Sequence, residues 1–228
     1  MRLLGTFQLE CSVTGTIRVP PNGQRILAYL GLQRGATRTV LAGTLWPDVS
    51  EEHALGSLRT ALWRLHRDRA PVVESRGDVL TLADDVTVDV HAFTRTAMLV
   101  VNTPDAFGDD LPLELLSFDD LLPGWDEEWV LSQRERLRQL RMHALESLSA
   151  LLADRGRHCL ALEAALSCVA MAPLRESAHR AVTAVYLAEN NVVEAFRHYE
   201  AFSRLIRDEL GMEPSANFRS MLPSGHQR

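Results

Sequence analysis

The sequence predicts a mostly α-helical protein: an N-terminal winged helix-turn-helix, with three helices and small antiparallel β-sheets, followed by an all-α domain of TPR-like (tetratricopeptide) repeats. Three observations support this prediction. β-rich runs, three helical patterns and a hairpin pattern follow one another within about the first 90 residues. The pattern from His91 onward is helical, and two of its segments align at an offset of 34 residues. We expect domains at 1–90 and 91–222, and a tail at 223–228.

The N-terminal elements follow from apolar periodicity and from breaking residues between the runs. The expected elements, in order, are a small sheet within 1–20, helices within 24–35, 37–46 and 51–67, and strands at 72–73 and 79–82. Gly35 is expected to stop the first helix, and Thr37 or Thr39 is placed to cap the second. Strands, three helices and a hairpin in this order are the layout of a winged helix.

The third expected helix has two different faces. Leu55, Leu58, Leu62 and Leu65 form one apolar stripe and need only a core role. The opposite side and its flank carry small residues, cations and one indole, namely Gly56, Arg59, Thr60, Trp63, Arg64 and Arg67. Such a face suits the DNA major groove, where arginine pairs with guanine and a threonine methyl contacts thymine. The alternatives are a solvated face, and a Trp63 that packs under the hairpin.

Two further positions complete the expected DNA interface. Arg76 lies at the tip of the expected hairpin, where a wing reaches the sugar-phosphate backbone or the minor groove. Arg38 and Thr39 begin the preceding helix, whose N-terminus can accept a phosphate.

Composition restricts the other classes of function. Lysine is absent, which excludes a P-loop lysine and a Schiff-base lysine. The three cysteines are scattered without metal-ligand spacing, and no GxSxG or HExxH motif occurs, so we expect no metal, no cofactor and no enzyme. No apolar run is long enough for a membrane span, so we expect a cytoplasmic, nucleoid-associated protein.

Charge differs between the two halves. Residues 1–92 hold ten arginines and ten acids, whereas the remainder holds fourteen arginines and twenty acids. This asymmetry permits DNA binding by the first half and protein contacts by the second. In the second half, Ala161 and Ala195 align at the 34-residue offset, and such small residues let paired helices approach closely. Two helix pairs are expected between the long helix at 127–153 and Pro214.

Several segments resemble one family of bacterial regulators. The stretches "LAGTLWPD", "SLRTALWRLHR" and "SRGDVLTLADDVTVDVHAF" resemble the OmpR-type winged helix of the Streptomyces antibiotic regulatory protein (SARP) family. "PGWDEEWVLSQRERLRQLRMHALE", "APLRESAHRAV" and "ELGMEPS" resemble the bacterial transcriptional activator domain that follows it there. The resemblance covers nearly the whole chain and suggests a small, stand-alone member.

The resemblance implies a pathway-specific transcriptional activator of a secondary-metabolite (antibiotic) gene cluster. Such a protein binds direct repeats in double-stranded DNA near promoters, as a homodimer at least on DNA, and recruits RNA polymerase. Arg59, Thr60, Arg64 and Arg67 then fall on the recognition helix and Arg76 on the wing. The alternative is a TPR-like protein-interaction adaptor, or a ligand-gated regulator, that does not bind DNA by itself.

Overall fold

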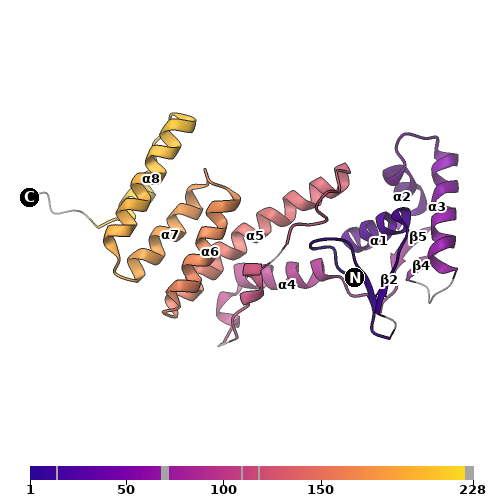
Figure 1. Cartoon of the computed structure of the whole chain (residues 1–228), viewed down its shortest axis with the longest axis horizontal. Helices are drawn as coiled ribbons and strands as arrows, with labels where there is room; N and C mark the ends of the chain where they lie inside the picture. Colours follow the sequence, from indigo (N-terminus) through magenta and orange to yellow (C-terminus); the bar gives the residue numbers. More distant parts are fainter. Residues whose placement is uncertain (14, 68–71, 109, 118, 224–228) are drawn as a thin grey trace, which may run out of the picture. The chain divides into compact units, whose positions relative to one another are not determined.

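The computed structural model describes residues 1–13, 15–67, 72–108, 110–117 and 119–223 (Figure 1). Its contacts divide the chain into two compact units, each made of two segments. The first unit comprises 1–94 and 119–137, and the second comprises 95–118 and 138–228. This division differs from the single boundary expected after residue 90, because the chain returns to the first unit before continuing into the second. The expected tail lies outside the described residues except for Pro223.

The first unit contains the expected series of strands, helices and hairpin. Its elements are β1 (Leu9–Cys11), β2 (Gly15–Ile17), α1 (Pro21–Gln33), β3 (Ala36–Thr37), α2 (Arg38–Leu45), α3 (Glu51–His66), β4 (Val73–Arg76), β5 (Val79–Leu82) and the starts of α4 (Asp89–Asn102) and α5 (Glu128–Asp154). β1 and β2 form a two-stranded antiparallel sheet, and the other strands form a sheet of order β3-β5-β4. The predicted winged-helix fold class is therefore confirmed. The Thr14-Gly15 pair, which the sequence marks as a turn between two β-rich runs, falls partly on Thr14, which lies outside the described residues.

Local chemistry sets the ends of the helices. Thr37, and not Thr39, caps α2, because its hydroxyl accepts a hydrogen bond from the Val40 backbone N–H at 3.3 Å. α1 ends at Gln33, two residues before the expected stop at Gly35, and Arg34 takes the left-handed conformation with φ 64°. The two-residue strand β3 then begins at once, and its pairing with β5 makes the antiparallel hairpin β4–β5 part of a three-stranded sheet.

The core of the first unit lies between α1, α2, α3 and the sheet. Leu58, Leu62 and Leu65 are buried there as predicted, whereas Leu55 is only half-buried and packs at the edge of the core. Ala61 is buried in addition, because the inner face of α3 is wide enough to include a small residue beside the leucine stripe.

The segment 119–137 completes the first unit. Leu121 forms β-bridges with Leu4 and Gly5, and the Tyr29 ring packs edge-on against Trp129 with centroids 5.3 Å apart. Asp89, the first residue of α4, receives the backbone N–H groups of Leu3 and Leu4 at 2.9–3.0 Å. The N-terminal residues are thus held between the two segments of this unit.

The second unit is helical. It contains the ends of α4 and α5 and the elements η1 (Pro104–Ala106), η2 (Leu113–Ser117), α6 (His158–Met171), α7 (Glu176–Ala188), α8 (Val192–Leu210) and α9 (Ala216–Met221). α6 packs on α7 and α7 packs on α8 (Figure 1). Ala161 on α6 and Ala195 on α8 are both 0% exposed, as expected for close helix approach. The prediction of two helix pairs before Pro214 is wrong: three helices lie between α5 and Pro214, and the short α9 follows it.

No helix among the residues that the structure describes combines the length and the apolar character needed to cross a membrane.

Candidate nucleic-acid interface

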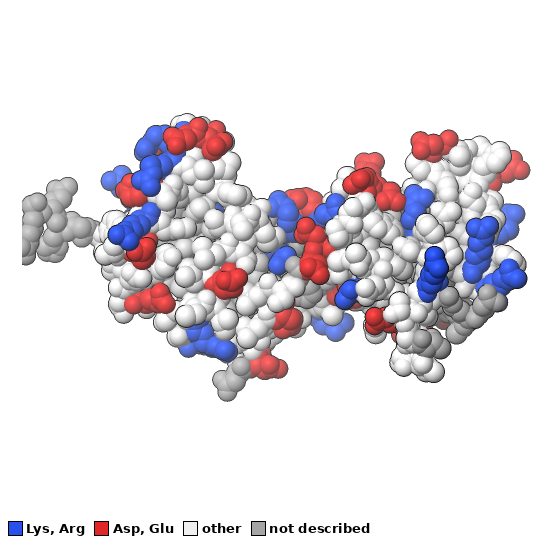
Figure 2. Space-filling view, viewed as in Figure 1, with Lys and Arg blue, Asp and Glu red and all other residues white. Residues whose placement is uncertain are grey.

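The predicted outer face of α3 is exposed. Arg59, Thr60, Trp63, Arg64 and Arg67 are all accessible to solvent. Within the described residues, Arg59 and Arg64 make no hydrogen bond and no ion pair, so their charge is uncompensated there. On the unit that holds α3, Figure 2 shows basic side chains over the later part of this helix and acidic ones near its start. The face therefore presents free cations to the surroundings.

The middle of this face is small and hollow. The start of α1 and one side of α3 enclose a groove lined by Pro21, Asn22, Glu52, Gly56, Thr60 and Arg64. A side chain added at Gly56 would meet no atom within 4 Å. The Thr60 hydroxyl donates to the Gly56 carbonyl at 3.0 Å, so its hydrogen-bond donor is already used within the helix. A ligand would therefore meet the Thr60 methyl and hydroxyl oxygen.

Trp63 does not pack under the hairpin. It is 58% exposed, and the guanidinium of Arg67 lies over its ring at 5.2 Å from the centroid. A cation held over an indole face gains a favourable interaction while both groups stay exposed. The side chain that joins α3 to the hairpin is His66, whose Nε2–H donates to the Val73 carbonyl at 3.1 Å.

The wing carries its own polar group. Arg76 pairs with Val79 across a two-residue turn in which Gly77 has φ 66°, a value that favours glycine. The Arg76 guanidinium is 72% exposed and lies 3.7 Å from Glu74 and 3.8 Å from Asp84. At these distances and exposures the two carboxylates offset its charge only in part.

The structure brings Arg38 to the wing. Its guanidinium donates to the Ser75 hydroxyl at 3.1 Å, and its backbone N–H donates to the Asp78 carbonyl at 3.1 Å. Thr39, the next residue, is exposed at the N-terminus of α2. The eight predicted residues thus form two groups: four on α3 with Arg67 at its C-cap, and three at the wing and the α2 start. His66 links α3 to β4, and the sequence patterns did not predict this contact. Its place one turn after Leu62, at the end of the leucine stripe, is the signal that could have indicated it.

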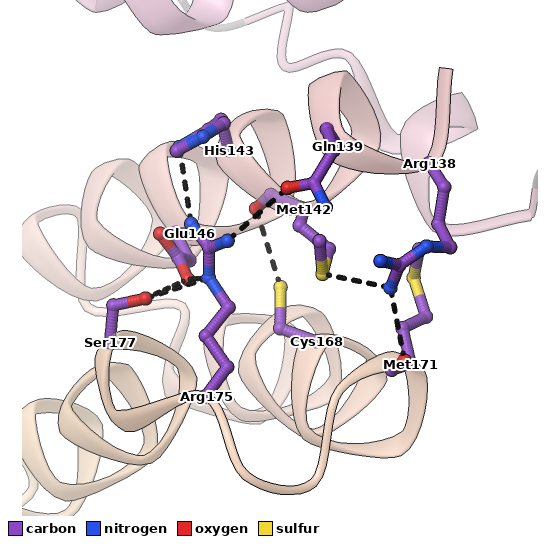
Figure 3. Close-up of polar contacts among 9 residues, drawn as sticks. All are labelled: Arg138, Gln139, Met142, His143, Glu146, Cys168, Met171, Arg175 and Ser177. Atoms are coloured by element: carbon purple, nitrogen blue, oxygen red, sulfur yellow. Dashed lines mark hydrogen bonds and ion pairs between the residues drawn. The ribbon is translucent and has the colours of Figure 1, made fainter. Parts of the chain in front are cut away.

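A second polar cluster lies in the second, helical unit (the repeat unit), at the joint between α5 and α7 (Figure 3). Arg175 donates from Nε to Glu146 at 2.9 Å, and Ser177 donates to the same carboxylate oxygen at 2.7 Å. Arg175 also reaches Gln139 at 3.5 Å and His143 at 3.4 Å. One arginine in the loop before α7 therefore holds three turns of α5.

Glu176, the residue after Arg175 in the "PLRES" stretch, binds the segment that precedes α9. Glu176 accepts from the backbone N–H of Ser215 at 2.8 Å and from its hydroxyl, and Ser215 in turn caps α9 through Phe218 N–H at 3.1 Å. The "PLRES" and "MEPS" stretches are therefore joined in space. From the sequence alone, "PLRES" indicates only a loop followed by a helix start. The signal that marks such a joint is a run of charged and hydroxyl residues after a helix-ending proline.

The buried Cys168 thiol of this unit has a structural role. Burial, and then the nearby Glu146 carboxylate, raise the pKa of the Cys168 thiol to about 12, and its Sγ donates to the Met142 carbonyl at 3.4 Å. Such a thiol is protonated at neutral pH and a poor nucleophile. Among the described residues, no group of three or more His, Cys, Asp or Glu side chains is arranged to hold a metal ion.

Comparison with known proteins now identifies the second half of the chain. Residues 116–223 match the family model of the bacterial transcriptional activator domain. The joined "PLRES" and "MEPS" stretches both lie inside the matched residues. The contact of Arg175 with Glu146 and that of Glu176 with Ser215 therefore hold this region together.

Longer regulators match most of the chain. Regulatory protein AfsR of Streptomyces coelicolor is 28% identical over 213 residues, which cover 88% of this chain and 21% of AfsR. AfsR of Streptomyces griseus is 27% identical over 216 residues, which cover 85% and 21%. The chain thus spans about a fifth of the length of these relatives. The matched proteins are regulators, and the predicted resemblance to the SARP family is confirmed.

One solved structure shares the fold of nearly the whole chain. Mycobacterium tuberculosis EmbR, solved in complex with a low-affinity phosphopeptide, superposes with a TM-score of 0.80 over 98% of this chain and 65% of EmbR. The sequence identity is 18%, so this match supports the fold alone.

Proposed function

We propose that the chain is a sequence-specific DNA-binding transcriptional activator, which regulates a secondary-metabolite gene cluster. The observation that carries this proposal is the outer face of α3, where Arg59 and Arg64 make no ion pair within the described residues and flank the open position Gly56. A helix with free arginines and a small central residue fits the major groove, which admits a helix and presents guanine acceptors to arginine.

In this proposal α3 enters the major groove and the wing rests on the neighbouring backbone. Arg64 and Arg59 read bases, and Thr60 offers its methyl to a thymine. Arg76 meets a phosphate, and Arg38 fixes the wing through Ser75. Thr39 lies where a phosphate can approach the start of α2.

The Trp63–Arg67 pair belongs to the same interface. The stacked guanidinium is held in place before DNA arrives, so fewer rotamers are lost when it contacts the backbone. The wide indole face next to it offers an apolar surface to a sugar or a thymine methyl.

Two protomers on direct repeats would supply the affinity that one lacks. About three to five phosphate contacts give one protomer only modest affinity at physiological salt. Two protomers spaced by one or two helical turns lie on the same side of the duplex. The bacterial transcriptional activator domain then contacts the second protomer, RNA polymerase, or both.

The test is fluorescence anisotropy with promoter DNA from the neighbouring genes and with scrambled DNA, across a salt series. Arg64→Ala is expected to weaken binding to the promoter by about 1–3 kcal/mol and to leave the weak binding to scrambled DNA nearly unchanged. Arg76→Ala is expected to weaken binding to both DNAs and to reduce the salt slope by up to about one. Arg2→Ala removes an exposed charge outside the interface and serves as the control.

Two results would contradict the proposal. Equal, weak binding of every DNA, unaffected by Arg64→Ala, would indicate an adaptor whose winged helix contacts protein. Equal effects of Arg64→Ala and Arg2→Ala would mean that α3 contributes charge alone and reads no bases.

A further inference from the structure

The outer side of α8 begins with exposed apolar residues. Val192 is 38% exposed, Val193 is 61% exposed and Phe196 is 36% exposed, on adjacent turns of the helix. α8 packs into its own unit through the opposite side, where Ala195 and Phe202 are buried. In stacked helical repeats an exposed outer helix face is normally covered by polar side chains. The apolar start of α8 departs from that rule.

Basic side chains follow the apolar ones along the same helix. Arg207 is paired with Glu213 at 2.8 Å, but the side chains of Arg204 and Arg219 have no hydrogen-bond or ion-pair partner within the described residues. Glu200 and Glu213 are the acids on the groove wall. Figure 2 shows basic side chains gathered along α8, with acidic ones at its end. This surface is locally basic within a half of the chain that carries an excess of acids.

The apolar and basic parts form one groove. One hollow is lined by Val192, Val193, Phe196 and Arg204, and a second runs between α8 and α9 past Phe196 and Arg219. The two hollows share Phe196 and Glu200, so they adjoin along α8, and together they are called the α8–α9 groove. α8 rises about 1.5 Å per residue, so its 19 residues offer a track of about 28 Å.

We propose that this α8–α9 groove docks an acidic amphipathic helix of a partner protein. The apolar row of such a helix covers Val193 and Phe196, and its carboxylates meet Arg204 and Arg219. Amphipathic helices bind apolar grooves in this manner, through residues spaced by three and four positions. The inference does not depend on DNA binding by α3.

Two other occupants fit the groove less well. A second copy of this chain, placed by a two-fold axis, would bring the same face against itself and so oppose like charges. The residues at 224–228, Ser-Gly-His-Gln-Arg, have no apolar side chain to cover Phe196 and no carboxylate side chain to meet Arg204.

The test uses the whole chain and a synthetic 18-residue helix labelled with fluorescein. Its leucines repeat at i, i+3, i+4 and i+7, and glutamates flank them. Fluorescence anisotropy is expected to give a dissociation constant of about 10–100 µM that rises with salt. Val193→Asp and Arg204→Glu are each expected to weaken binding about tenfold.

Matched variants separate the groove from the rest of the surface. Leu166→Asp on α6 changes an apolar residue that is 41% exposed, and Arg180→Glu on α7 reverses an exposed charge. Both are expected to bind the peptide as the unchanged protein does. Circular dichroism is expected to be the same for all four variants, because every changed side chain is exposed.

Each of the other outcomes overturns the proposal. The first is a failure to bind the peptide at about 1 mM. The second is equal binding of a scrambled peptide, or of one with lysine in place of glutamate. The third is concentration-dependent self-association, seen by sedimentation, that Val193→Asp abolishes, because the occupant is then a second copy.

Discussion

The stability of the repeat unit is expected to depend on a pair of histidines that are neutral at pH 7. His179 and His198 stack with ring centroids 5.0 Å apart, and their Nδ1 and Nε2 atoms lie 3.1 Å apart. His179 Nε2–H donates to the Pro173 carbonyl at 2.8 Å, which leaves its Nδ1 as the acceptor for His198 Nε2–H. A proton added at His179 Nδ1 would face the His198 N–H directly.

The direction of the pH effect follows from the pKa values. Burial lowers the pKa of His179, and burial together with the neighbouring His179 lowers the pKa of His198 from 6.5 to about 4. At pH values between the unfolded-state pKa of 6.5 and the lowered folded-state pKa, the unfolded chain binds more protons than the folded one. The free energy of unfolding is therefore full above pH 6.5 and falls as the pH drops toward 4.

The magnitude is smaller than the pKa difference alone suggests. A fall from 6.5 to about 4 corresponds to an upper value of about 3.4 kcal/mol. His198 is only half-buried, so solvent screening reduces this to about 1–2 kcal/mol. That is a measurable part of the stability of a small domain.

The assay is urea unfolding at pH values from 7.5 to 4.5, followed by far-UV circular dichroism. The four tryptophans, Trp46, Trp63, Trp125 and Trp129, all lie in the first unit, so their fluorescence reports separately on that unit. We expect the helical signal of the repeat unit to lose stability over this range. His198→Gln keeps an N–H donor and cannot titrate, so it should reduce the pH dependence to the part that His179 contributes. If the slope in His198→Gln is as steep as in the unchanged protein, or has the opposite sign, the reasoning is wrong.

Three other outcomes follow from single positions. Gly56→Ala and Gly43→Ala both add a methyl to open space within a helix, so each should raise the free energy of unfolding by about 0.5–1 kcal/mol. Only Gly56→Ala should also weaken promoter binding. Equal binding by both variants argues against α3 as the helix that reads the bases. Asp89→Ala leaves the backbone N–H groups of Leu3 and Leu4 without their acceptor. In denaturant titration it should lower the free energy of unfolding by about 2–4 kcal/mol. No change would show that water replaces the carboxylate. A thiol reagent at pH 8 should label the exposed Cys159 in the folded protein and Cys168 only after unfolding, as peptide mass mapping will show; equal rates contradict the burial of Cys168.

Local patterns predicted the winged helix and the face of α3. The leucine spacing gave the buried side through Leu58, Leu62 and Leu65, and helical geometry then put Arg59 and Arg64 on the other side. Such inferences succeed because they involve residues within a few turns of one helix.

Contacts between distant residues lay outside the reach of those patterns. Arg175 lies 29 positions from Glu146, and His179 lies 19 positions from His198. Spacing within one helix says nothing of such distances, because the loop between the helices sets them. The two-residue strand β3 was missed for the same reason: only its pairing with β5 makes Ala36 and Thr37 a strand.

The return of the chain to the first unit has a consequence for its synthesis. A ribosome that has made residue 94 has not yet made the segment 119–137, which supplies Trp129 beside Tyr29 and Glu127 beside Arg25 at 2.9 Å. At 5–20 residues per second, the missing 43 residues take about 2–9 s to appear. During that interval the edge formed by Leu3 and Leu4 lacks its partners Leu122 and Leu121. The first unit can therefore reach its full set of contacts only when synthesis of the segment 116–223, which matches the bacterial transcriptional activator domain, has already begun.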